Sequence, residues 1–459
     1  MENITIEACA AEGKALTHWN GVVVFVPFAV PGDVVDIRVT KKSKNYYEGF
    51  VERIVTPSKD RLEPFCQHFG VCGGCKWQPL PYPMQLEAKR QQVYDQLVRI
   101  GHLNVPEIRP TIPSDKIQYY RNKLEFTFSS KRWLLKDEDI ESVPENDRMG
   151  LGFHVGKFFD KVLDIKHCYL QKDPSNDIRL FIKKYAVENG LDFFDIRQNV
   201  GYVRNMFIRT TDTGDLMVIM CFFYENREDR EKMLDAIAEA FPQITSLYYI
   251  INNKLNDSIG DQECILYKGE PTIRETMESL TFRIGPKSFY QTNSEQAYKL
   301  YSVARDFAEL TGNEIVYDLY TGTGTIAQFV SGKAAKVVGI EYVPEAIEDA
   351  KVNAAGNGIT NCEFFAGDMK DVLRRDFINE HGQPDVIILD PPRAGIHPDV
   401  AKVILEASPA RMVYVSCNPA SQARDLALFA DKYDITAVQP VDMFPHTQHV
   451  ENVCALRLR

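Results

Sequence analysis

The fold of this chain is decided by the stretch Asp318-Leu319-Tyr320-Thr321-Gly322-Thr323-Gly324, which includes the end of the apolar run Glu314–Leu319. The run predicts a buried strand, and the glycine-rich turn after it leads into a helical segment. Glycines let a backbone pass close to a ligand at the carboxyl edge of a sheet, where open α/β folds bind cofactors. A Gly-x-Gly turn is often only a turn, so the interpretation depends on the strands that follow.

Three later apolar runs repeat the pattern of strand, polar tip and helix, and they are Val337–Glu341, Asp385–Leu389 and Arg411–Ser416. Glu341 puts a carboxylate at a strand tip, where nucleotide-type sites hold ribose hydroxyls. Alternation of buried strands with helices implies a parallel sheet. We therefore expect a Rossmann-like α/β domain over residues 281–459, and the first turn lacks the third glycine of a dinucleotide site.

Two further regions precede this domain. Residues 1–60 alternate apolar runs with turn signals and predict a small OB-like β-barrel, whereas residues 61–280 predict a central region of mixed α+β structure. The elements that we expect in these regions are strands at Val22–Val26, Val34–Val39, Phe50–Val55 and Met217–Phe223, and helices at about Met84–Gly101 and at Arg227–Ala240.

The composition is that of a soluble globular protein. The chain has 459 residues, of which 44% are hydrophobic and 25% charged, so more than one domain is expected. No apolar run approaches the roughly 20 residues of a membrane helix, and Met1–Ala10 lacks the features of a secretory signal. We expect a cytoplasmic protein with no membrane association, and a monomer.

The net charge of −11 argues mildly against a protein whose whole surface binds nucleic acid, because phosphate neutralisation requires Lys and Arg. A local basic surface that binds nucleic acid is still an alternative, although a short run of charged residues is usually just a solvent-exposed surface. The candidate residues are Lys41, Lys42, Lys44, Arg121, Lys123, Lys131 and Arg132.

Four of the ten cysteines form a candidate metal site. Cys66, Cys72 and Cys75 are closely spaced, and Cys168 supplies a fourth thiolate. A disulfide framework is not expected in a reducing compartment. Four sulfurs could hold zinc or an iron–sulfur cluster, and spacing alone favours zinc.

Cys417 is the candidate nucleophile, because it follows the strand Arg411–Ser416 directly and precedes the turn-forming Asn418-Pro419. The alternative is a buried structural cysteine. Near the end of the chain, Phe444–Glu451 gathers two imidazoles and a carboxylate. Each of these side chains, taken alone, has a structural explanation.

Together the motifs resemble those of the RNA uracil-C5 methyltransferase family, which is S-adenosylmethionine-dependent, and the resemblance covers nearly all of the chain. The motifs that carry it are Phe289-Tyr290-Gln291-Thr292-Asn293, Asp390-Pro391-Pro392-Arg393-Ala394-Gly395, Ser416-Cys417-Asn418-Pro419 and His446-Thr447-Gln448-His449-Val450-Glu451. The resemblance implies that Cys417 is the nucleophile and Glu451 the proton acceptor. It also implies a set of S-adenosylmethionine contacts, namely Gln291, Tyr320, Thr325, Glu341, Asp368 and Asp390. Thr325 and Asp368 depart from the asparagines that are common in the family, which affects details of cofactor contact.

Uracil chemistry explains why a thiolate and a carboxylate belong together. C5 of uracil is a poor nucleophile until a thiolate adds to C6, and the methylated adduct then needs a base to remove the C5 proton. Cys417 and Glu451 are predicted to supply these two groups.

The resemblance also bears on the RNA. The cysteine spacing is similar to the four-iron four-sulfur site of the family's ribosomal RNA branch, so it implies a structural 4Fe–4S cluster and 23S rRNA as partner, with tRNA as the alternative. Residues 1–60 resemble the TRAM domain, an RNA-binding module, in which Tyr46 and Tyr47 either stack on bases or pack. The target uridine is expected to be flipped out of its stack.

Three rival functions are less consistent with these motifs. RNA cytosine-C5 methyltransferases typically carry a cysteine in the Pro-Pro motif, where this chain has Arg393. Methyltransferases of exocyclic amines typically have an aromatic residue there and need no thiolate. A non-catalytic RNA-binding protein would not be expected to keep Gln291, Cys417 and Glu451 together.

Overall fold

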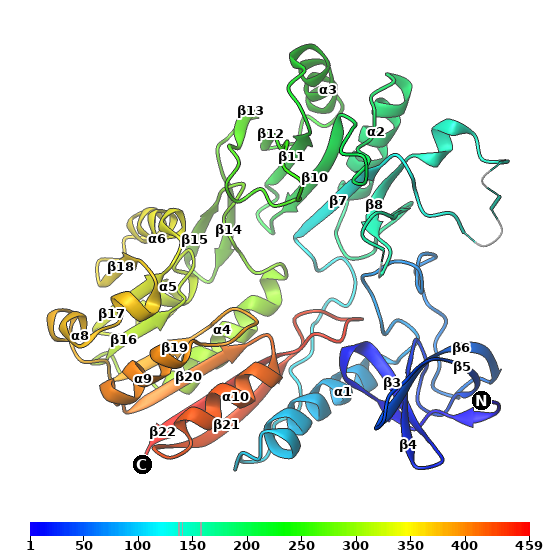
Figure 1. Cartoon of the computed structure of the whole chain (residues 1–459). Coiled ribbons are helices and arrows are strands. Elements are labelled where there is room, and N and C mark those ends of the chain that lie inside the picture. The colour runs from blue at the N-terminus through cyan, green and yellow to red at the C-terminus, as the bar shows by residue number, and fades with distance from the viewer. Residues whose placement is uncertain (136–137, 140, 157) are drawn as a thin grey trace.

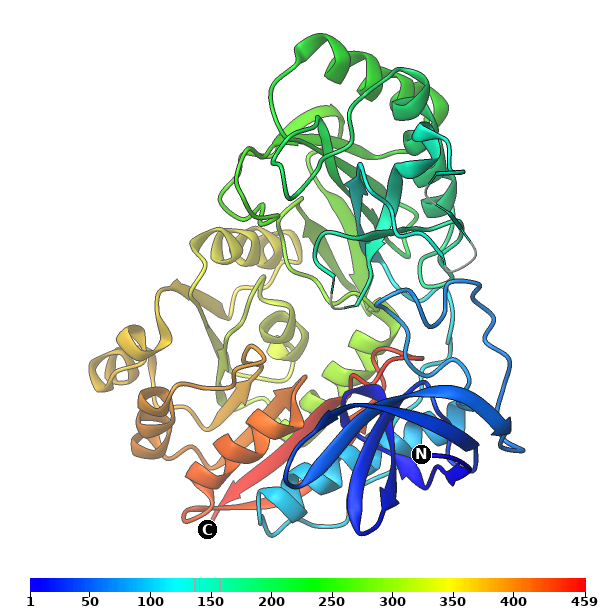
Figure 2. The same cartoon turned by 45° about the vertical axis from the view of Figure 1, so that its right-hand side comes forward.

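The computed structural model describes residues 1–135, 138–139, 141–156 and 158–459. An N-terminal sheet and a C-terminal sheet lie on either side of helix α1 (Tyr82–Tyr94), and a central sheet lies above them (Figures 1 and 2). Within the described part of the chain, no helix is long and apolar enough to cross a membrane.

The N-terminal sheet has six strands in the order β1-β5-β6-β4-β3-β2. They are β1 (Ile4–Thr5), β2 (Ala8–Cys9), β3 (Lys14–Trp19), β4 (Val22–Pro27), β5 (Val34–Lys42) and β6 (Tyr46–Thr56), with the short helix η1 (Ala11–Gly13) between β2 and β3. Alternate side chains form a separate small core that includes Val24, Val35 and Ile37. Strand β6 is longer than predicted and pairs with both β4 and β5.

The predicted helix near residue 84 is confirmed as α1, which continues into a π-helical turn, η2 (Asp95–Ile100). Val93 and Leu97 are fully buried and belong to the core of the C-terminal sheet. Helix α1 is therefore packed as part of the C-terminal domain, although almost 200 residues separate them in sequence.

The central sheet has seven strands in the order β13-β12-β11-β10-β7-β8-β9. They are β7 (Lys123–Ser129), β8 (Gly150–His154), β9 (Val162–Asp164), β10 (Val203–Thr210), β11 (Leu216–Phe222), β12 (Ser246–Ile251) and β13 (Ile265–Gly269), and the helices are η3 (Glu145–Arg148), α2 (Ser175–Glu188) and α3 (Arg227–Ala240). One face packs on α2 and α3. The other face contributes Phe207 and Ile219 to the core that the C-terminal domain shares.

The C-terminal sheet confirms the Rossmann-like prediction, with seven strands in the order β18-β17-β16-β19-β20-β22-β21. They are β16 (Ile315–Leu319), β17 (Lys336–Glu341), β18 (Cys362–Ala366), β19 (Val386–Leu389), β20 (Arg411–Ser416), β21 (Tyr433–Val441) and β22 (Glu451–Leu458). The first five are parallel, and β22 is antiparallel to both of its neighbours.

Helices cover both faces of this sheet, as expected for parallel strands buried on both sides. Helices α4 (Ser294–Ala308), α5 (Thr325–Ser331) and α6 (Pro344–Gly356) share one core. The opposite face carries α1 with α7 (Met369–Val372), α8 (Arg375–His381), α9 (Pro398–Ala407) and α10 (Pro419–Phe429). A hairpin of β14 (Ile273–Met277) and β15 (Leu280–Ile284) lies across the proposed boundary at residue 280, and the domain boundaries stay predictions.

Candidate active site

The carboxyl edge of the C-terminal sheet begins with the turn after β16. Asp318 is fully buried, and its carboxylate accepts hydrogen bonds from Thr321 Oγ1 (2.5 Å) and from the backbone N–H of Ala327 (2.9 Å). Gly324 has φ +75°, and a Cβ there would lie 2.9 Å from carbon atoms of Ala350 and Phe364. The turn therefore requires glycine, and Asp318 fixes it against the start of α5.

Glu341 connects this turn to the second strand. Its two carboxylate oxygens accept hydrogen bonds from the backbone N–H groups of Gly322 and Val343, each 3.1 Å long. A carboxylate oxygen keeps a second lone pair, so Glu341 can still accept a hydrogen bond from a hydroxyl of a bound ligand.

The other predicted cofactor residues lie around the same edge. Burial raises the pKa of the Tyr320 hydroxyl to about 12, and the negative charges of Asp368 and Glu341 add to that rise. Asp368 caps α7 and pairs with Lys370 Nζ at 3.1 Å, which holds the pKa of that carboxyl below its usual range. Thr325 is buried in α5. Burial and the charge of Asp390 raise the pKa of the Tyr301 hydroxyl, and the nearby Gln291 side chain opposes that rise.

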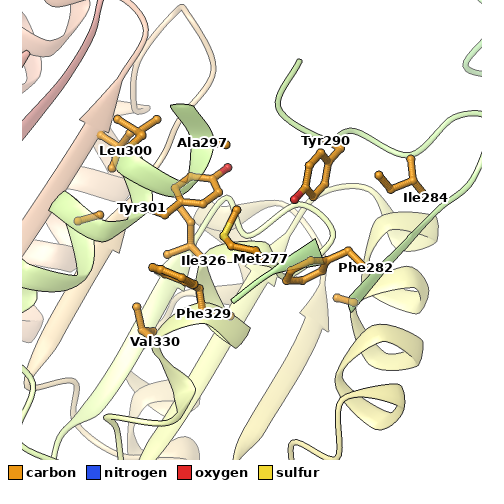
Figure 3. Close-up of a cluster of buried hydrophobic side chains, with 14 of the residues drawn as sticks. Met277, Phe282, Ile284, Tyr290, Ala297, Leu300, Tyr301, Ile326, Phe329 and Val330 are labelled. Atoms are coloured by element: carbon orange, nitrogen blue, oxygen red, sulfur yellow. The ribbon is translucent and has the colours of Figure 1, made fainter. Parts of the chain in front are cut away.

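Tyr290 is a residue of this site that sequence reasoning did not single out. Its side chain is only 7% exposed, and its hydroxyl has no hydrogen-bond partner among the described residues. Figure 3 shows the hydroxyls of Tyr290 and Tyr301 pointing toward one another above Met277. An unpaired buried hydroxyl costs roughly 1–3 kcal/mol, which a polar ligand atom would recover. The sequence feature that could have identified Tyr290 is its position next to Gln291 in the motif Phe289–Asn293.

Cys417 and Glu451 are brought together by strand pairing. The antiparallel register of β20 and β22 pairs Ser416 with Asn452, and Val441 of β21 pairs with Glu451. One step beyond Ser416 places Cys417 opposite Glu451. The two side chains interact electrostatically in the folded chain, because the Glu451 charge acts on the thiol.

Burial sets the protonation of this pair. It raises the pKa of Glu451 to about 8, with a further rise from Asp390, and it raises the pKa of the Cys417 thiol to about 11. The positive charge of Arg393 opposes both shifts. The Arg393 side chain also approaches Nδ1 of His449 at 3.5 Å. Arg393 is thus a second site residue that the prediction did not include.

These shifts predict how activity depends on pH. In the roles predicted for these residues, attack by Cys417 needs its thiolate and proton removal by Glu451 needs its carboxylate, and both forms increase as pH rises. Turnover at saturating substrates should therefore increase from about pH 6 through about pH 8 and continue to rise toward about pH 10. Replacing Arg393 with methionine should move the rise to higher pH, because the cation that favours both anions is lost.

The matched control for that profile is Arg374→Met, since Arg374 is exposed and pairs with Asp371 (3.1 Å) away from the thiol. Its profile should equal that of the unmodified protein. A turnover that is constant or falls between about pH 6 and about pH 8 would contradict the assigned roles.

The loop 442–450, which leads into Glu451, is fixed by helix α1. Asp442 and Lys89 form an ion pair in which both side chains are fully buried, and Tyr82 also donates to Asp442 (2.8 Å). The Gln85 side chain accepts a hydrogen bond from the backbone N–H of His446 (2.8 Å) and lies 3.2 Å from its Nδ1. Burial lowers the pKa of His446 to about 4, so its ring is neutral near pH 7.

The four predicted metal ligands, Cys66, Cys72, Cys75 and Cys168, line one cavity of about 530 Å³ beside the central sheet. Burial raises the pKa of Cys75 to about 12, and the other three thiols add to that rise. Among the described residues, no three Cys, His, Asp or Glu side chains form a ready metal site. The donor set nevertheless suits a soft metal, because four sulfurs face one space.

The strand order and the polar strand tips define the class of protein, a methyltransferase with the S-adenosylmethionine-binding Rossmann-like fold. The chain belongs to the tRNA (uracil-5-)-methyltransferase family, which it matches over residues 209–459, and residues 2–51 match the TRAM domain. These matches confirm the predicted enzyme class and the predicted N-terminal module.

Similar proteins span the whole chain. Uncharacterised RNA methyltransferases of Porphyromonas gingivalis and Bacteroides thetaiotaomicron are each 58% identical, over 97% and 98% of this chain and 98% and 100% of theirs. The structure of Pyrococcus abyssi tRNA (uracil-54, C5)-methyltransferase in complex with S-adenosyl-L-homocysteine is similar with a TM-score of 0.76 and 29% identity, covering 99% of this chain and 100% of that one. The protein is an RNA uracil-C5 methyltransferase that uses S-adenosylmethionine.

Proposed function

We propose that this enzyme methylates C5 of a uridine in 23S rRNA through a covalent bond between Cys417 and C6. The observation that carries the chemistry is the position of Cys417 opposite Glu451 at the ends of β20 and β22, with the positive charge of Arg393 acting on the thiol. A buried carboxyl with a pKa of about 8 is suited to accept a proton near neutral pH. We further propose that the enzyme acts in the cytoplasm as a monomer.

In the proposed reaction, Arg393 stabilises the Cys417 thiolate, which adds to C6 while the C5–C6 π electrons move toward O4. S-adenosylmethionine supplies an electrophilic methyl group. C5 would accept this methyl group, with S-adenosyl-L-homocysteine as the leaving group. Glu451 then takes the C5 proton, the C5–C6 double bond re-forms, and the thiolate leaves. Glu341, Gln291, Tyr320, Thr325, Asp368 and Asp390 are proposed to bind the cofactor.

The choice of 23S rRNA rests on the cysteines. We propose that Cys66, Cys72, Cys75 and Cys168 hold a 4Fe–4S cluster with a structural role, because methyl transfer needs no electron. A tRNA substrate is the second candidate, since the family and the similar P. abyssi enzyme are both named for tRNA.

The cluster is tested by its composition. Protein purified without oxygen should contain about four iron and four sulfide per chain with a broad visible absorbance, and Cys75→Ser should lose them while Cys264→Ser, at a half-buried cysteine outside the cavity, should not. A colourless protein that contains zinc and is fully active would overturn this proposal.

The substrate is tested with S-adenosylmethionine that carries a tritiated methyl group. The enzyme is incubated with unmodified 23S rRNA or with unmodified tRNA, and the labelled nucleoside is identified after digestion. We expect 5-methyluridine from 23S rRNA alone. Label in tRNA would identify the second candidate, and label in 5-methylcytidine would contradict the proposed base.

A further inference from the structure

The segment 119–122 contacts both the loop 442–450 and the motif that contains Gln291. The hydroxyl of Tyr120 donates to the carbonyl of Pro445 (3.0 Å), so the segment touches the loop 442–450. On the other side, the backbone N–H of Asn122 donates to the carbonyl of Thr292 (2.8 Å), and its side chain donates to the carbonyl of Gln291 (2.9 Å). The outer end of this segment, Tyr119, therefore lies at the border of the site.

Tyr119 belongs to a set of four rings, Phe65, Tyr119, His167 and Tyr169, which we call the aromatic platform. The centroid of Tyr169 lies 4.4 Å from His167, 5.3 Å from Phe65 and 6.0 Å from Tyr119. Phe65 also contacts His446 at 5.0 Å. The platform thus extends from the loop 442–450 to the surface of the molecule.

The backbone of Tyr119 adopts an unusual conformation, and the residue is partly exposed. Its φ is +55°, which is uncommon for a residue with a large side chain. The backbone N–H donates to the carbonyl of Tyr169 (2.8 Å), and the hydroxyl lies 3.1 Å from Nε2 of His167. The side chain remains 37% exposed. Strained residues of this kind cluster at ligand-binding sites, where the surrounding contacts enforce them.

Basic side chains border the aromatic platform. Lys116, Arg121 and Lys172 line a hollow of about 210 Å³ with Tyr119, and the exposed Lys166 precedes His167. Lys116 and Lys172 are paired with Glu295 and Asp212, so the local charge is only mildly positive. In a chain of net charge −11, this border still suits an RNA backbone while the rings carry most of the contact.

We propose that the aromatic platform stacks the unpaired nucleotides that adjoin the target uridine. This inference rests on the proposed function. An enzyme that takes a base out of its stack leaves the neighbouring bases without a partner, and aromatic rings replace that partner in single-stranded RNA binding. Tyr119 is the exposed end of the platform and stacks on the first of these bases.

Tyr119→Ala tests the proposal. Loss of one base–aromatic stack should raise the KM for the accepting RNA by about 5- to 150-fold, while kcat at saturating RNA and the KM for S-adenosylmethionine stay unchanged. Tyr119→Phe should restore the KM, because the ring rather than the hydroxyl stacks. The matched control is Tyr94→Ala, at a tyrosine on α1 that is 39% exposed with Arg99 at 5.5 Å from its ring.

A binding assay separates this inference from the proposed function. A short oligouridine that contains one 2-aminopurine should lose fluorescence on binding to the unmodified protein and to Tyr94→Ala, and should keep it with Tyr119→Ala. Equal quenching by all three proteins, or an unchanged KM in Tyr119→Ala, would overturn the platform. Absence of 5-methyluridine with normal quenching would overturn only the proposed reaction.

Discussion

Replacing Cys417 with alanine is expected to lower turnover by on the order of 10⁶-fold, the size of loss that follows removal of a covalent nucleophile. Without the thiolate, C5 keeps the low nucleophilicity of uracil, and no other thiol is placed opposite Glu451 by the pairing of β20 with β22. The measurement is 5-methyluridine formed per enzyme with tritiated S-adenosylmethionine. Binding of S-adenosyl-L-homocysteine should be retained, because the thiol lies outside the turn after β16.

The matched control is Cys9→Ala. Cys9 lies in the N-terminal sheet, and burial raises the pKa of its thiol to about 11, as for Cys417. Its loss should leave turnover unchanged. Formation of 5-methyluridine at a normal rate by Cys417→Ala would rule out the covalent route and require direct attack by C5.

Replacing Glu451 with glutamine should stop the reaction after methyl transfer. The amide has nearly the same shape but cannot accept the C5 proton, so Cys417 cannot be eliminated. Turnover should fall by roughly 10²–10⁴-fold, and one RNA per enzyme should remain covalently bound. A denaturing gel detects this adduct as a slowly migrating band that carries the tritiated methyl group.

Glu275→Gln is the control for that experiment. Glu275 is also a fully buried carboxyl with a pKa raised by burial, but it lies in β14 and accepts a hydrogen bond from Ser294 (2.7 Å). It should show no adduct. If Glu451→Gln turns over freely without a stable adduct, another group must remove the proton.

Much of the C-terminal fold was predictable, because the relevant signals are local. Strand Arg411–Ser416 was predicted with the bounds that the structure shows, and Glu341 and Asp390 were expected at strand tips. Strand β6 was predicted too short, since Tyr46 and Tyr47 were considered as RNA contacts and not as part of a strand. Gly49 of β6 lies close to β5, where a Cβ would be 2.8 Å from the carbonyl oxygen of Arg38.

Other parts of the site could not be predicted, because they depend on contacts between distant segments. Nothing near Lys89 in the sequence indicates that it meets Asp442, which lies 353 positions away. The influence of Arg393 on the Cys417 thiol likewise follows from the adjacency of β19 and β20. The Tyr290 hydroxyl becomes a candidate ligand contact only when the structure shows that it is buried without a hydrogen-bond partner among the described residues. A sequence pattern indicates which residues can react, and tertiary packing sets their protonation.

The placement of β22 also has a consequence for the order of assembly during synthesis. Strand β22 lies between β20 and β21 although it follows both in sequence, so the sheet has a gap until β22 has been synthesised. The contact of Asp442 with Lys89 also joins segments that are distant in sequence, and such contacts form slowly. Until then, the apolar edges of β20 and β21 are open to wrong pairing, and a chain that stops short of β22 would expose them to aggregation.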